Sequence, residues 1–158
     1  MSDDNRSHGD APPASSPTTE PTGDDTVSGT APVASGTDAL DAILEQSREL
    51  GFLGPGPIGP QRDHARSFLA PLGDATRVLD LGSGGGLPGL VIAWELPSIE
   101  LVLLDGMERR CQFLELAVDQ LSLSDRVTVV CGRAEELARS ERLSSSFPTV
   151  VARSFGPP

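Results

Sequence analysis

The stretch that decides the fold of this chain is RVLDLGSGGGLPGL, residues 77–90. It begins as an apolar strand containing one acidic residue, continues into a glycine cluster, and reaches Pro88, which suits the first turn of a helix. Glycine allows the backbone to turn tightly and to approach a ligand closely. The stretch therefore predicts a strand, a loop and a helix whose first N–H groups face a bound anion, as in a nucleotide-type cofactor site.

The spacing of the glycines separates two classes of cofactor. A dinucleotide site has the pattern G-x-G-x-x-G directly after the strand. Counted from Gly82, this pattern fails at Leu87. Counted from Gly84 it is met by Gly84, Gly86 and Gly89, but the loop then begins about two residues late. The register therefore argues against a nicotinamide dinucleotide.

Asp80 gives a second argument about the cofactor. A carboxylate just before the first glycine is expected to face the ligand, where it would repel a pyrophosphate. S-adenosylmethionine instead carries an ammonium and a sulfonium group, which the same carboxylate would attract. The residues favour S-adenosylmethionine. A nicotinamide oxidoreductase stays as an alternative, and it predicts that Asp80→Asn is tolerated and that S-adenosyl compounds are not bound.

Composition divides the chain into three parts. Residues 1–36 are acidic and rich in Ser, Thr and Pro, and such a segment is expected to be disordered. Residues 37–72 are expected to hold helices and a Gly/Pro connector, and residues 73–158 the cofactor-binding α/β domain. The start lacks the features of a signal peptide, and no later apolar run is long enough to span a bilayer. We therefore expect a cytoplasmic protein with no membrane partner.

The overall charge bears on the kind of substrate. The formal net charge is −11, from 23 acidic residues against 12 Lys and Arg. Proteins that bind nucleic acids usually carry a basic face, which this chain does not offer in bulk. A local arginine cluster could still serve, although the net field would slow encounter with RNA.

Hydrophobic periodicity predicts alternating strands and helices after the first two helices. The expected helices are 37–50, 62–72, 87–96, 107–121 and 134–142, the expected strands are 76–81, 100–104, 126–131 and 149–153, and 54–60 is expected to be irregular. Strands that alternate with helices imply a parallel, doubly wound, Rossmann-like sheet.

Two positions after the glycine loop are candidates for holding an adenosine. Asp105 lies 23 residues beyond Gly82, at the end of the second expected strand, where an acid accepts hydrogen bonds from ribose hydroxyls. An ordinary turn aspartate is the alternative. At the end of the third strand, the backbone at Ala134 could bind the adenine edge, with Glu135 beside it, although helix capping explains these residues nearly as well.

The cysteines and histidines predict no metal site. Cys111 and Cys131 are expected to be free buried thiols, because disulfides are rare in cytosolic proteins. His8 lies in the tail and His64 is isolated, so no ligand cluster or Cys–His pair has suitable spacing.

Several of these motifs resemble the RsmG (GidB) family of 16S rRNA guanine-N7 methyltransferases. The resemblance is carried by the glycine motif at 78–89, by ERRCQFL at 108–114, by RAE at 133–135 and by VARSF at 151–155. It implies a class I, S-adenosylmethionine-dependent methyltransferase whose partner is 16S rRNA or the small ribosomal subunit. The nitrogen N7 has a free lone pair, so orientation of the reactants could carry catalysis without a general base.

The resemblance also implies which residues form the site. Arg153 matches the family's arginine beside the methyl donor and is the catalytic candidate. The cofactor contacts are expected from Asp80, Gly82, Ser83, Gly84, Gly86, Leu87, Asp105, Ala134, Glu135 and Arg153.

Three departures from the family leave a second reading open. The family's basic N-terminal part is replaced by the Gly/Pro connector, and Gly106-Met107 follows Asp105 where the family more often has Glu-Ser. The resemblance implies seven strands, so a chain with only the first four is expected to be truncated at its C-terminus. The alternative is an RsmG-like paralogue or fragment that binds S-adenosylmethionine but acts on a small molecule or is non-catalytic.

Overall fold

The computed structural model describes residues 36–135 and 147–153. The helices are α1 (Gly36–Glu49), α2 (Ile58–Arg66), α3 (Leu69–Leu72), α4 (Gly89–Glu95) and α5 (Glu108–Gln120). The strands are β1 (Arg77–Leu81), β2 (Glu100–Asp105), β3 (Val127–Cys131) and β4 (Thr149–Val151). The tail expected over residues 1–36, apart from its last residue, and most of the helix expected over 134–142 lie outside the described residues.

The described strands form one parallel sheet in the order β3-β2-β1-β4. The predicted α/β, Rossmann-like fold with a parallel sheet is therefore confirmed. In the register of the sheet, Asp80 of β1 lies between Leu103 of β2 and Val151 of β4. The carboxyl ends of β1, β2 and β3 consequently meet at one edge, next to the glycine loop.

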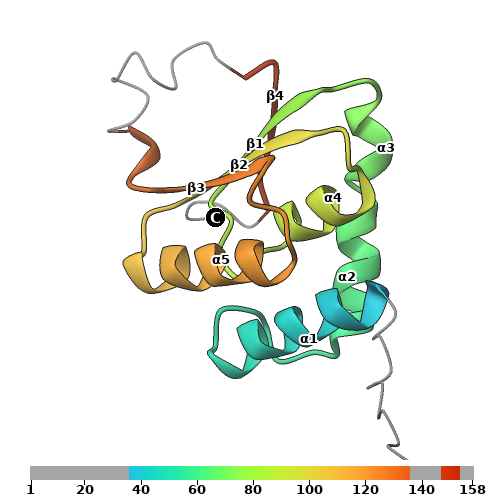
Figure 1. Cartoon of the computed structure of the whole chain (residues 1–158). Coiled ribbons are helices and arrows are strands. Elements are labelled where there is room, and N and C mark those ends of the chain that lie inside the picture. Colours follow the sequence, from blue (N-terminus) through green and yellow to red (C-terminus); the bar gives the residue numbers. More distant parts are fainter. Residues whose placement is uncertain (1–35, 136–146, 154–158) are drawn as a thin grey trace, which may run out of the picture. The chain divides into compact units, whose positions relative to one another are not determined.

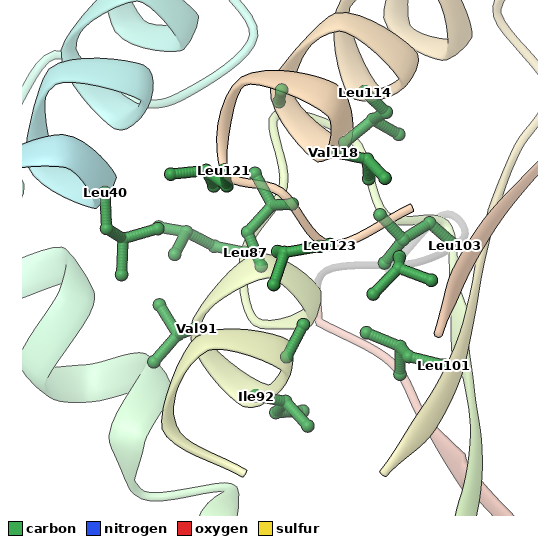
Figure 2. Packing of buried hydrophobic residues seen from close by; sticks show 14 of the residues in the cluster. Leu40, Leu87, Val91, Ile92, Leu101, Leu103, Leu114, Val118, Leu121 and Leu123 are labelled. Carbon is green, nitrogen blue, oxygen red and sulfur yellow. The ribbon is translucent and has the colours of Figure 1, made fainter. Parts of the chain in front are cut away.

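One face of the sheet is covered by α4 and α5, as Figure 1 shows. Alternate residues of β2, Leu101 and Leu103, are fully buried on this face. Figure 2 shows them turned toward Ile92 of α4 and Val118 of α5. This pattern follows from the strand period of two, which sends every second side chain to the same face.

The N-terminal helices extend the same core. Leu40 and Leu44 of α1 are fully buried, and Figure 2 shows Leu40 beside Leu87 and Val91, which flank the start of α4. Helix α1 contacts both α2 and α4. The segment before the sheet is thus packed on the helix that follows the glycine loop.

The second helix differs from the prediction. The sequence predicted an irregular connector over 54–60 and one helix over 62–72, whereas α2 begins at Ile58 and the chain then turns before α3. Pro60 is tolerated because it lies in the first turn of α2, where backbone N–H groups have no helical partner. At the other end, the N–H groups of Ser67 and Phe68 donate to carbonyls three residues earlier, which tightens the chain and ends α2.

Candidate cofactor site

The glycine loop between β1 and α4 is held against the end of β2. The N–H groups of Gly82 and Ser83 both donate to the carbonyl of Leu104, at 2.8 and 2.9 Å. Gly82, Gly84 and Gly86 have φ values of 74°, 57° and 97°, a region that side chains other than glycine rarely adopt. The glycines predicted to form the cofactor loop thus supply the turn that brings its backbone over the strand end.

Asp105, at the end of β2, is fixed by the same loop. Its Oδ2 accepts the N–H of Gly84 at 2.9 Å, and its Oδ1 accepts the N–H of Met107 at 2.8 Å. Nη1 of Arg110 lies 3.7 Å from Oδ2. Since an ionised carboxylate has about four acceptor positions, Asp105 keeps capacity for further donors while its orientation is set by the backbone.

A cavity of about 370 Å³ opens at the carboxyl ends of β1, β2 and β3. Its volume lies within the range of small-ligand sites. It is lined by Leu81, Gly82, Leu104, Asp105, Gly106, Met107, Arg110, Gly132, Arg133, Ala134 and Glu135. Four residues predicted from sequence, Gly82, Asp105, Ala134 and Glu135, therefore meet around one cavity.

The other predicted loop residues lie around this cavity rather than in its lining. Ser83 is 1% exposed, and its hydroxyl donates to the backbone carbonyl of Asp80 at 3.0 Å. Leu87 is buried in the core. A Cβ on Gly86 would overlap the side chain of Leu90. These residues stabilise the conformation of the loop by packing and hydrogen bonding. Gly84 contributes through its hydrogen bond to Asp105.

Asp80 is buried beneath the loop, at the start of α4. Its Oδ2 accepts the N–H of Gly89 at 3.1 Å, while its Oδ1 is buried without a hydrogen-bond partner among the described residues. Burial raises the pKa of Asp80 to about 7, although the Ser83 hydroxyl, the N–H of Gly89 and the positive charge of Arg153 oppose the rise. Asp80 does not line the cavity.

Arg153 follows β4, which pairs with β1 on the side away from β2. Its side chain is half-buried, and burial lowers its pKa while the charge of Asp80 raises it. It is not part of the cavity lining. The glycine loop thus lies between two charged regions: Asp105 and Arg110 beyond β2, and the electrostatically coupled pair Asp80 and Arg153 toward β4.

The two cysteines correct a prediction. Cys111 of α5 and Cys131, the last residue of β3, form a disulfide with their Cα atoms 5.7 Å apart, where free thiols were expected. The expectation rested on the cellular compartment alone. Packing of α5 against β3 brings the two Cα atoms into the range that a disulfide requires. The bridge joins the elements on either side of Asp105, whose carbonyl oxygen lies 3.3 Å from Sγ of Cys111.

Sequence reasoning missed Arg110 and Met107 as cavity residues. Arg110 was not among the predicted site residues, yet it lines the cavity beside Asp105. The available signal was position: a residue in the first turn of a helix that follows a parallel strand lies at the carboxyl edge of the sheet, where ligands bind.

Within residues 36–135 and 147–153, no helix has the length and apolar character needed to cross a membrane. The same part of the chain contains no group of three or more His, Cys, Asp or Glu side chains placed to hold a metal ion.

Solved structures define the class of fold. The chain is similar to a putative O-methyltransferase from Klebsiella pneumoniae, with 24% identity and a TM-score of 0.59 over 75% of this chain and 54% of that one. It is also similar to the O-methyltransferase from Bacillus cereus in complex with SAH, with 18% identity and a TM-score of 0.56 over 73% of this chain and 53% of that one. The fold is that of a class I methyltransferase.

Sequence relatives define the family. The model of the GidB family, described as rRNA small subunit methyltransferase G, matches residues 67–157. Ribosomal RNA small subunit methyltransferase G from Mycobacterium marinum is 42% identical over 70% of this chain, and that from Synechococcus sp. is 41% identical over 51%. The chain belongs to the GidB family. It spans 49% and 34% of the lengths of these two relatives.

Proposed function

We propose that this chain binds S-adenosylmethionine at the cavity beyond β2 and is the cofactor-binding part of an enzyme that methylates N7 of a guanine in 16S rRNA. The observation that carries the proposal is Asp105, fixed by two backbone N–H groups at the rim of a cavity of about 370 Å³ in a chain of the GidB family. An rRNA substrate would make the protein cytoplasmic.

The described residues fit the adenosine part of the cofactor. A carboxylate at the end of the second strand suits the two ribose hydroxyls, and Asp105 is only 5% exposed, so water competes little for it. Ala134 and Glu135 lie at the end of the cavity formed after β3, where the adenine would lie. The glycine loop presents only backbone atoms to the cofactor, so the adenosine could approach it closely.

The methionine part would extend from the glycine loop toward β4. Oδ1 of Asp80, which is buried without a hydrogen-bond partner among the described residues, would be the candidate acceptor for the ammonium group. When bound, S-adenosylmethionine supplies a methyl group made electrophilic by its sulfonium. Arg153 would lie on the same side and orient the target guanine or a neighbouring phosphate. Because N7 already carries a lone pair, the residues of this chain have to align the reactants rather than remove a proton.

The acidic character of the chain supports a second candidate. With a net charge of −11, the chain offers little general attraction for a phosphate backbone. An RsmG-like protein that binds S-adenosylmethionine but acts on a small molecule, or is non-catalytic, would need no such attraction.

Transfer of a radiolabelled methyl group separates the candidates. The full chain is incubated with labelled S-adenosylmethionine and small ribosomal subunits that lack the modification, and the product is analysed for N7-methylguanine. Labelled N7-methylguanine in 16S rRNA, together with binding that weakens steeply with salt, supports the rRNA assignment. Cofactor binding without labelled RNA, or RNA binding that is insensitive to salt, supports the second candidate.

A further inference from the structure

Segment 47–53 runs from the last turn of α1 to the connector and packs against the glycine loop. Ser47 is fully buried, and its hydroxyl donates to the carbonyl of Gly85 at 2.8 Å across 38 residues of sequence. A Cβ built on Gly85 would overlap the Ser47 hydroxyl and would lie 2.7 Å from the side chain of Leu53. Segment 47–53 therefore contacts the backbone of the glycine loop directly, and only glycine fits at position 85.

Segment 47–53 also contacts α5. The ring of Phe52 packs edge-on against Phe113 of α5 with a centroid distance of 5.7 Å. The guanidinium carbon of Arg109 lies 5.9 Å from the centroid of the Phe52 ring. Segment 47–53 thus connects the glycine loop with the helix that begins just after Asp105.

The hydrogen bond of Ser47 is unusual for a serine inside a helix. Such a hydroxyl most often donates to a carbonyl one turn earlier in its own helix, and serine is a weaker helix former than alanine. A buried hydroxyl without a partner would also be costly. At this position the donor instead satisfies the buried carbonyl of Gly85, while the N–H of Gly86, in the same peptide group, donates to Ser83 at 2.8 Å.

We propose that Ser47 is a positioning residue of the cofactor site: through the Gly85 carbonyl it holds the glycine loop in the conformation in which Gly84 orients Asp105. This inference rests on the proposed binding of S-adenosylmethionine. Without the hydroxyl, the Gly85 carbonyl loses its buried donor and the loop gains conformations that turn this carbonyl toward water. The ligand then binds only the fraction of molecules with the competent loop, which weakens its apparent affinity.

The test compares Ser47→Ala with Ser67→Ala in the full chain. Ser67 makes the same kind of bond, from its hydroxyl to the carbonyl of His64 at 2.7 Å, but on an exposed site at the end of α2. Binding of S-adenosylhomocysteine is measured by calorimetry, and stability is measured separately by urea unfolding. We expect affinity about five-fold weaker in Ser47→Ala, the equivalent of one net hydrogen bond, and unchanged affinity in Ser67→Ala.

Two further measurements distinguish positioning from a general loss of stability. Leu72→Ala removes a buried side chain of α3 outside the site and should lower stability while leaving the affinity of the folded protein unchanged. Amide hydrogen exchange of residues 82–86 should accelerate in Ser47→Ala, whereas exchange in β3 should not.

If Ser47→Ala costs stability but binds S-adenosylhomocysteine as tightly as the wild type, Ser47 is a core residue and the inference is wrong. If Ser47→Ala fails to fold, the same comparison of stability and affinity is made with Ser47→Cys, which has a similar volume and a weaker hydrogen-bond donor. A folded wild type that does not bind the ligand at all would instead overturn the proposed function on which the inference rests.

Discussion

The carboxylate of Asp80 lies under the first residue of α4, where its Oδ2 accepts the N–H of Gly89 at 3.1 Å. This contact connects β1 to the helix that follows the glycine loop. Asp80 is fully buried among apolar side chains, and its pKa rises to about 7 because burial disfavours the charged form. The free energy of unfolding should therefore depend on pH.

Stability should fall as the pH rises through this range. The folded-state pKa of Asp80 is about 7 against 3.8 for the unfolded chain, so the folded state binds the proton more tightly. The contribution of Asp80 is fully present below the unfolded pKa and is lost as the pH rises toward the folded pKa. The slope is at most about 1.4 kcal/mol per pH unit. Urea unfolding at a series of pH values measures it.

The variant Asp80→Asn should remove this slope, because the amide cannot ionise. The matched control is Asp74→Asn, which changes an exposed aspartate and should leave the slope as in the wild type. A wild type whose stability does not change between pH 4 and pH 7, after comparison with the control, would contradict the buried position of Asp80.

Close packing between β1 and α4 predicts that Gly89→Ala is destabilising. A Cβ at Gly89 would overlap the side chain of Leu103 and Oδ2 of Asp80. Overpacking of this kind costs about 1–3 kcal/mol. The control is Gly54→Ala, since a Cβ at Gly54 meets nothing within 4 Å. Chemical unfolding should show the loss for Gly89→Ala only, and equal stability of the two variants would argue against this packing.

The disulfide between Cys111 and Cys131 should stabilise the folded chain. Its cysteines are 20 residues apart, and closing a loop of this length in the unfolded state is worth about 3 kcal/mol. Unfolding with and without a reductant should differ by this order, and the double variant Cys111→Ser, Cys131→Ser should be insensitive to reductant. Detection of two reactive thiols in the denatured, unreduced protein would rule the bridge out.

The sequence predicted the part of the site that depends on local pattern. The strand, glycine loop and helix of residues 77–90, and the acid at the end of β2, carry strong signals: runs of apolar residues, glycine clusters and fixed spacing along a βαβ unit. The alternation of strands with helices predicted the parallel sheet in which they lie. Asp105, Ala134 and Glu135 were predicted to contact one adenosine, and the structure places them around one cavity.

Contacts between distant segments could not be predicted in this way. The hydrogen bond from Ser47 to Gly85 and the disulfide between Cys111 and Cys131 depend on how helices pack on the sheet and on each other. Nothing in the spacing of these residues encodes that packing. The burial of Asp80 was also missed, because the carboxylate was expected to face the ligand, whereas it lies on the same buried face of β1 as Val78.

The most direct test of the account is calorimetric titration of the full chain with S-adenosylhomocysteine, in the wild type and in Asp105→Ala. The matched control is Asp119→Ala, an exposed aspartate in α5. The account predicts micromolar binding by the wild type and by the control, and a loss of at least about tenfold in Asp105→Ala, since a charged hydrogen-bond partner contributes about 1.5–3 kcal/mol. No binding by a folded wild type, or equal binding by Asp105→Ala, would contradict it.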